Sequence, residues 1–109
     1  MKRGQKAYIQ VTIVFNEEDD GRWTARCLEL GTSTFGSDLD EAGEAMQEAI
    51  GLQLNTLEDL GECFNFLKEN KVKIYDASPS PAITDVDVKN IPLGSFVHPE
   101  VHEIYCVPA

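Results

Sequence analysis

The stretch Gly36-Ser37-Asp38-Leu39-Asp40-Glu41-Ala42-Gly43-Glu44-Ala45-Met46-Gln47-Glu48-Ala49-Ile50 decides the fold, because it has the features of a helix entry. Asp38 can accept a hydrogen bond from the backbone N–H of Glu41, and Glu41 can reach back to the N–H of Asp38, which would make a reciprocal cap. Small and apolar residues then recur three and four positions apart and form one stripe: Leu39, Ala42, Ala45, Met46, Ala49 and Ile50. We therefore expect an amphipathic helix from Leu39 to about Leu54, with its solvent face formed by Asp40, Glu44, Gln47 and Glu48.

Strand patterns precede this helix. Residues Tyr8 to Phe15 alternate, with one apolar face formed by Ile9, Val11, Ile13 and Phe15. The charged segment 16–21 ends in Asp20-Gly21, which is typical turn chemistry, and a return strand is expected over Trp23 to Leu30. Both faces of that return strand are partly apolar, so we expect it to lie centrally. Gly31 ends it, and a short third strand is expected over Thr32 to Phe35.

The segment after the first helix is less regular. Thr56, with Asp59 three positions on, predicts a second helix that ends near Asn70 and includes Gly61. A fourth strand is expected over Val72 to Tyr75, then a linker over residues 77–82, and short strands at 86–88 and 101–107. The predicted fold class is α+β: a three-stranded antiparallel sheet plus a further strand, packed on one or two helices (β-β-β-α-(α)-β). We expect a domain over residues 1–75 and a C-terminal extension over 76–109 that lies on its own domain or on a neighbouring subunit.

Composition restricts the function. The chain has 109 residues, enough for one modest domain, and its 19 carboxylates against 9 Lys and Arg give a formal net charge of −10 at pH 7. Such a surface repels phosphate backbones, so no nucleic-acid binding is expected; it suits solubility or a basic protein partner. Cys27, Cys63 and Cys106 form no CxxC pair, which indicates core residues in a reduced, cytoplasmic setting. No signal peptide and no membrane-spanning segment are predicted.

The order of these motifs resembles the HicB-like antitoxin family. The resemblance is carried by Tyr8 to Phe15, the acidic turn with Gly21, residues 23–31 (Trp-Thr-Ala-Arg-Cys-Leu-Glu-Leu-Gly), and Gly36-Ser37-Asp38-Leu39-Asp40-Glu41-Ala42, with Glu48-Ala49-Ile50 closing the pattern. It covers about half the chain, to Leu54. The resemblance implies a partial RNase H-like fold without RNase H activity, and a partner that is a small basic HicA-type toxin, an mRNA-cleaving protein whose catalytic histidine the antitoxin covers.

The family resemblance also implies a contrast at the C-terminus. Many family members carry a C-terminal helix-turn-helix or ribbon-helix-helix domain that binds their promoter. Residues 76–109 show no helical DNA reader, and Lys89 is the basic residue there. The chain therefore looks like a short form without promoter binding.

Enzymatic chemistry is not predicted. An RNase H-type nuclease needs carboxylates converging on two metal ions, with one on the first strand, but Tyr8 to Phe15 contains no acid. His98, Glu100 and His102 would share one face of a strand with Cys106; their spacing lacks the helical HExxH pattern, so we expect surface or interface histidines instead of zinc ligands. Neither catalytic residues nor a cofactor is predicted.

The leading hypothesis is therefore an antitoxin-type binding protein that neutralises its toxin by occlusion. Its candidate partner-binding residues are Glu17, Glu18, Asp19, Asp20, Arg22 and Trp23. For Trp23, a core position and a partner-facing anchor both remain open. A second hypothesis is a stand-alone, self-associating module without catalysis, a dimer or tetramer, because exposed strand edges favour association. A third, a metal-dependent nuclease, would require activity on RNA with magnesium or manganese.

Overall fold

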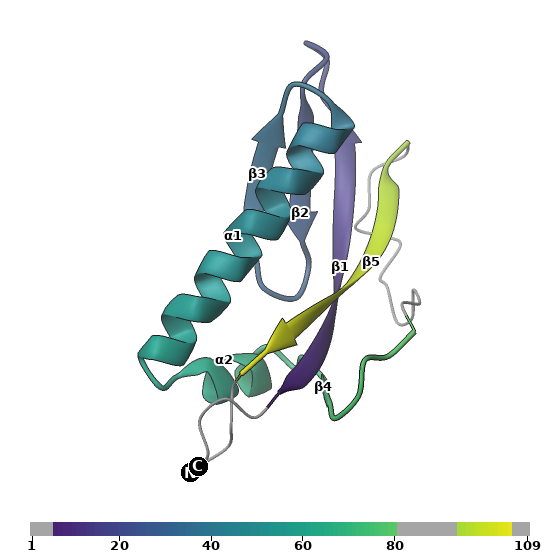
Figure 1. Cartoon of the computed structure of the whole chain (residues 1–109). Coiled ribbons are helices and arrows are strands. Elements are labelled where there is room, and N and C mark those ends of the chain that lie inside the picture. Colours follow the sequence, from purple (N-terminus) through teal and green to yellow (C-terminus); the bar gives the residue numbers. More distant parts are fainter. Residues whose placement is uncertain (1–5, 81–93, 106–109) are drawn as a thin grey trace.

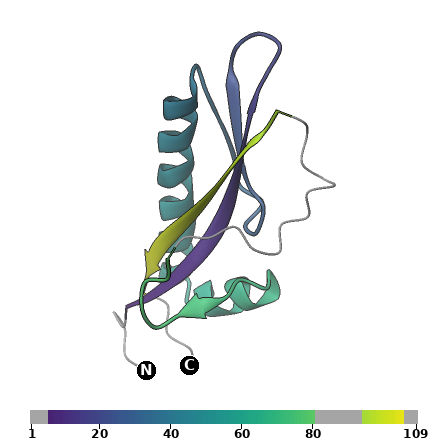
Figure 2. The same cartoon turned by 90° about the vertical axis from the view of Figure 1, so that its right-hand side faces the viewer.

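The computed structural model describes residues 6–80 and 94–105, which form an α+β fold (Figure 1). Within these residues, five strands and two helices follow one another in the order β1 (Ala7–Glu17), β2 (Trp23–Cys27), β3 (Ser33–Gly36), α1 (Leu39–Asp59), α2 (Cys63–Glu69), β4 (Ile74–Tyr75) and β5 (Phe96–Ile104). Seen from the side, α1 forms one layer against the curled sheet, and α2 lies across the lower end (Figure 2).

β1 is the centre of the antiparallel sheet. One of its edges pairs with β2 over residues 13–17, and β3 continues the sheet beyond β2. Tyr8 and Ile9 pair with both β4 and β5, so these two strands must lie on opposite edges of β1. β5 follows β1 over its whole length from Ala7 to Phe15. The return strand therefore does lie inside the sheet, as its composition predicted.

The core lies between α1 and one face of the sheet. The predicted apolar face of the first strand is buried: Ile9, Val11, Ile13 and Phe15. β2 adds Ala25 and Cys27, and α1 adds Ala42, Met46, Ile50 and Leu54. Cys63, Leu67 and Val72 close the end of this core near α2. Burial of Cys27 and Cys63 confirms that these two cysteines are core residues, whereas Cys106 lies outside the described residues.

One of the two predicted hydrogen bonds of the helix cap is present, and the other has a different partner. The Asp38 carboxylate accepts a hydrogen bond from the Glu41 N–H at 2.8 Å, as expected. Glu41, however, does not reach the N–H of Asp38; its carboxylate accepts from the Ser37 N–H at 3.1 Å and from the Ser37 hydroxyl at 2.9 Å. The reciprocal bond is thus displaced by one residue, because Ser37 offers both a backbone and a side-chain donor.

The second helix begins later in the sequence than predicted. α1 continues through Thr56 to Asp59, and the Thr56 hydroxyl donates to the Leu52 carbonyl inside it, so Thr56 is not a cap. The break falls at Gly61, whose φ of +71° is a left-handed conformation that glycine adopts without strain. α2 starts at Cys63 and ends with Asn70 as its C-cap, the predicted end.

Several strand bounds differ from the expectation. β2 stops at Cys27 instead of Leu30, β3 is shifted by one residue, and β4 contains only Ile74 and Tyr75. The C-terminal strand, predicted over 101–107, begins at Phe96 and pairs with β1 of its own chain. The strand predicted at 86–88 lies outside the described residues.

Glu29 closes a gap in the sheet between the ends of β2 and β4. Its carboxylate accepts the Thr12 backbone N–H at 2.7 Å and the Thr12 hydroxyl at 3.0 Å, as a neighbouring strand's carbonyl would. The carboxylate also lies 3.9 Å from the Cys27 sulfur. Burial, with a smaller contribution from Glu29, raises the pKa of the Cys27 thiol to about 12, so this cysteine stays protonated and unreactive at neutral pH.

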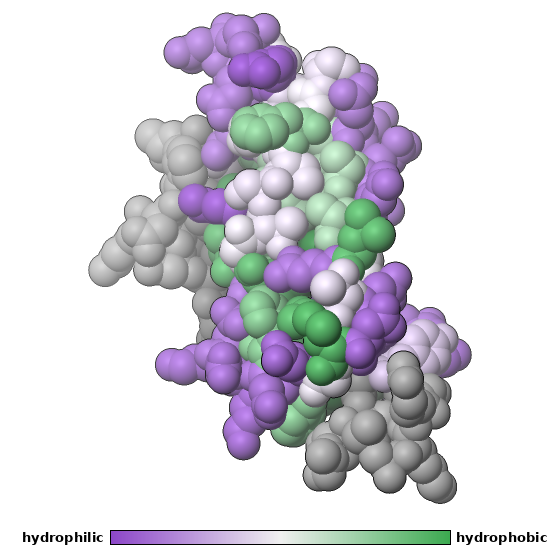
Figure 3. Space-filling model, turned by 90° about the vertical axis from the view of Figure 1, so that its left-hand side faces the viewer, coloured by the Kyte–Doolittle hydropathy of each residue, from purple (hydrophilic) through white to green (hydrophobic). Residues whose placement is uncertain are grey.

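One side of the molecule shows apolar and polar residues next to each other (Figure 3). On the side where β3 and the flank of α1 are seen, apolar areas are interrupted by polar residues (Figure 3). Exposed large apolar side chains on these two elements include Phe35 and Leu52. Within residues 6–80 and 94–105, neither helix has the length and apolarity needed to cross a bilayer.

Candidate functional site

The acidic turn forms the distal tip of the β1–β2 hairpin. Gly21 takes the left-handed φ of +88° that the Asp20-Gly21 pair predicted. Two backbone hydrogen bonds close the turn, from the Glu18 N–H to the Arg22 carbonyl at 2.7 Å and from the Gly21 N–H to the Glu18 carbonyl at 2.9 Å. The four acids from Glu17 to Asp20 are all exposed. The turn therefore presents its negative charge to solvent, away from the core.

Asp20 and Arg22 interact within this tip. The Asp20 carboxylate accepts the Arg22 backbone N–H at 3.1 Å and the guanidinium Nε at 2.8 Å. These bonds, the backbone one foremost, lower the pKa of Asp20. Arg22 thus neutralises one acid, while the carboxylates of Glu17, Glu18 and Asp19 form no ion pair with any described residue. The tip keeps an excess of negative charge.

Trp23 connects the tip to the C-terminal strand. It is half-buried, and its ring lies against Phe96 with 5.8 Å between ring centroids and an interplanar angle of 32°. The sequence predicted a core or half-buried tryptophan but gave no indication of this partner, which is 73 positions further along the chain. Phe96 is 56% exposed, so the pair forms an aromatic surface at the start of β5.

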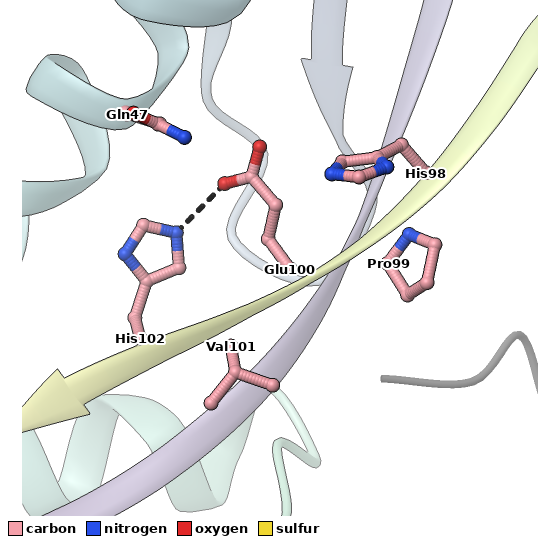
Figure 4. A pocket seen from close by; sticks show the side chains of 6 residues that line it. All are labelled: Gln47, His98, Pro99, Glu100, Val101 and His102. Atoms are coloured by element: carbon pink, nitrogen blue, oxygen red, sulfur yellow. Dashed lines mark hydrogen bonds and ion pairs between the residues drawn. The ribbon is translucent and has the colours of Figure 1, made fainter. Parts of the chain in front are cut away.

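A groove runs between α1 and β5. β5 is the edge strand next to β1, whereas α1 packs mainly on β3 and β2, so the face of β5 that points toward the helix is not covered by it. His98, Glu100 and His102 project from this face, opposite Ile13, Val11 and Ile9 respectively. Figure 4 shows their side chains on the same side of the strand, with the amide of Gln47 from α1 directed toward them.

These three residues share a face as predicted, but they are not simply surface groups. Glu100 is 8% exposed, and its carboxylate lies 2.9 Å from Nε2 of His102 (Figure 4). His98 is exposed. No set of three or more His, Cys, Asp or Glu side chains within the described ranges has an arrangement that could hold a metal ion. The arrangement is a strand-borne carboxylate–imidazole pair that opens onto a groove.

The helix side of the groove is the face of α1 that the sequence predicts to be exposed to solvent. It contains Asp40, Glu44 and Gln47, together with Gly43. The signal was present in the spacing, because positions 40, 44 and 47 are separated by four and three residues and so lie along one line of a helix. What the spacing could not provide was the strand opposite them, since β5 comes about fifty residues later.

Comparisons with known protein families, with curated proteins and with solved structures found no match.

Proposed function

We propose that this chain is a binding protein of the HicB-like antitoxin type, which neutralises a small basic HicA-type toxin by covering its active site. The observation that carries the proposal is the exposed acidic tip of the β1–β2 hairpin, on a chain with a formal net charge of −10. The motif order from Tyr8 to Leu54, which resembles that of the HicB-like family, supports the type of protein proposed, and the acidic tip is the proposed surface for binding the toxin.

The charge distribution supports recognition of a basic protein. Opposite charge accelerates encounter between two proteins and fixes their orientation, and this effect weakens as salt screens it. The same charge disfavours direct contact with RNA, so in this proposal the chain acts on the toxin and not on the toxin's substrate. Trp23 and Phe96, next to the tip, provide the aromatic area that interfaces need beside charge.

The proposal is tested by co-expression with a tagged HicA-type toxin and recovery of the complex. One variant reverses the tip charges through Glu17→Lys, Glu18→Lys, Asp19→Lys and Asp20→Lys. A matched variant with the same change in net charge reverses four exposed acids elsewhere: Glu48→Lys, Asp59→Lys, Glu69→Lys and Asp76→Lys. The tip variant should lose the complex and the matched variant should keep it. Equal recovery of both would remove the tip from the interface, and no recovery with the unaltered chain would refute the proposal.

A second candidate function is self-association, favoured by the outer edge of β5. β5 is nine residues long and pairs only with β1 among the described strands. Such an edge offers backbone donors and acceptors to another strand, although Pro99 lacks one donor. Light scattering after size exclusion of the full chain, over a range of concentrations, tests this function. A monomer mass throughout would contradict it.

A further inference from the structure

The groove between α1 and β5 is lined by aromatic rings and by carboxylates. Phe15 and Phe96 line it where β5 begins, and Asp40 and Glu44 lie on the helix side. Glu100 lies on the strand side, where its carboxylate is engaged by His102 at 2.9 Å. Asp40 and Glu44 are both exposed, and neither forms an ion pair with a residue in the described part of the chain. Two acids of the groove are thus available to an outside cation.

The spacing of these two acids matches a particular cation. Positions four apart on a helix lie about 5–6 Å from each other, so both carboxylates can reach different edges of one planar group. A guanidinium offers five N–H donors in a fixed fork and stacks on aromatic faces, whereas an ammonium is a strongly hydrated point charge. Phe96, at 56% exposure, supplies the aromatic face.

Gly43 keeps the groove open. It lies in α1 between Asp40 and Glu44, and a Cβ built on it would contact the Phe15 ring at 3.7 Å. Glycine in a helix interior destabilises the helix by about 1 kcal/mol relative to alanine. At this position the missing side chain leaves space over Phe15 on the groove side, within the set of residues that lines the groove.

We propose that this groove binds an arginine side chain of a basic partner protein, with the guanidinium between Asp40, Glu44 and the face of Phe96. The inference rests on the proposed function only in assigning the arginine to a partner. A second copy of this chain is a poor occupant because it would bring ten further negative charges to an acidic groove. Nucleic acid is excluded by the same repulsion.

The direct test is a titration of the full-length, isotope-labelled protein followed by NMR, with N-acetyl-arginine-methylamide as the probe. The matched lysine compound tests the preference for guanidinium, and the citrulline compound, neutral and of similar shape, tests the need for charge. The arginine probe should shift amides of residues 40–47 and 96–100 and bind more tightly than the lysine probe, and the citrulline probe should not bind. Fluorescence of Trp23, the single tryptophan, reports on the adjoining Phe96 ring.

Three variants locate the binding. Glu44→Lys should weaken the arginine probe by about fivefold or more, as expected for reversal of an exposed charge in contact. Glu48→Lys, one turn further on the same helix and outside the groove, changes the net charge equally and should leave binding within about twofold. Gly43→Leu should fill the groove and abolish binding without lowering the unfolding midpoint, since leucine is a good helix former. Equal effects of Glu44→Lys and Glu48→Lys, or shifts spread over all acidic surfaces, would overturn the inference.

The toxin experiment separates this inference from the proposed function. If the toxin binds and both it and the arginine probe are indifferent to Glu44→Lys, the groove is refuted while the antitoxin proposal stands. If the toxin does not bind the unaltered chain, the antitoxin proposal fails, and the small-molecule titration still decides whether the groove recognises arginine.

Discussion

Gly36 is the position at which the packing of α1 on the sheet can be tested most sharply. It ends β3, opposite Trp23 in β2, and lies directly below the first turn of α1. A Cβ built on Gly36 would lie 2.3 Å from the backbone nitrogen of Ala42, 2.8 Å from its Cα and 2.8 Å from the carbonyl carbon of Glu41. All three atoms belong to the helix backbone, so no side-chain rotation can relieve the contact. We predict that Gly36→Ala is severely destabilising.

The magnitude follows from the movement required. To lengthen the 2.3 Å contact to the ordinary 3.4 Å, the start of α1 must move by more than 1 Å. α1 is held there by the Asp38 cap and by the hydrogen bond from the Thr34 hydroxyl to the Ala42 carbonyl at 3.2 Å, and the fully buried Ala42 and Met46 pack below. Overpacking of a core costs about 1–3 kcal/mol, and losing a cap costs about 1 kcal/mol more. We therefore expect a loss of about 3 kcal/mol in the free energy of unfolding.

Gly51→Ala is the matched control. In contrast to Gly36, Gly51 has nothing within 4 Å of a built Cβ, and it lies in the interior of α1. Alanine there should stabilise the protein by about 1 kcal/mol through helix propensity. Urea unfolding followed by circular dichroism measures both variants, with the slope m checked for constancy. If Gly36→Ala lay within 1 kcal/mol of the unaltered chain at equal m, the close approach of α1 to β3 would be refuted.

Three further predictions concern the internal polar contacts. Glu29→Ala leaves the Thr12 N–H without its acceptor and should lower the free energy of unfolding by about 1–3 kcal/mol. Glu29→Gln keeps an acceptor oxygen and should lower it less. Equal losses for the two variants in urea unfolding would contradict the role of Glu29 in closing the gap in the sheet. Glu41→Ala removes the acceptor of both Ser37 donors and should lower the thermal midpoint, at a cost of about 1 kcal/mol, with Glu48→Ala on the same helix as the unaffected control. The Cys27 thiol has a pKa of about 12 in the folded protein, whereas in the unfolded chain it releases its proton near pH 9. The free energy of unfolding should therefore fall as the pH rises above 9, by about 1.4 kcal/mol at pH 10. Cys27→Ala should lack this part of the alkaline loss, and identical pH slopes would show that the thiol is not buried.

Local chemistry determined the parts of the fold that the sequence predicted. The apolar face of β1 follows from strict alternation, the hairpin turn from Asp20-Gly21, and the start of α1 from the Asp38 cap, and each depends on residues within a few positions of one another. The end of α1 was missed because Thr56 and Asp59 imitate a new cap. Gly61, with its positive φ, is the true break, but a lone glycine has the same appearance in sequence whether it ends a helix or lies within it.

Only the C-terminal part of β5 was predicted from the sequence, because polar residues in the middle of the strand interrupt the apolar face that Phe96 and Ile104 mark at its ends. Its polar residues His98, Glu100 and His102 point to the helix side of the sheet, where apolar residues are expected, and Val97 and Val101 point to the other side. An apolar pattern on the helix side is needed only where a helix covers the strand. α1 lies over β2 and β3, so the edge strand is free to carry charge there. Position at the sheet edge, a long-range property, decided this pattern.

The polar residues on this face of β5 also explain why the sequence predicted the acidic tip but not the groove. The acids at the hairpin tip are contiguous in the sequence, so the sequence alone predicts their cluster. The groove, in contrast, has one wall from residues 40–47 and the other from residues 96–102. Each wall alone has an ordinary explanation, a solvated helix face or a pair of surface histidines. Only the pairing of β5 with β1 brings them together, so that the partly buried Glu100 and the exposed Asp40 and Glu44 contribute negative potential to one concave surface. In the proposed arginine site, the walls of the groove should concentrate that potential more than the open tip does, where solvent screens the charge.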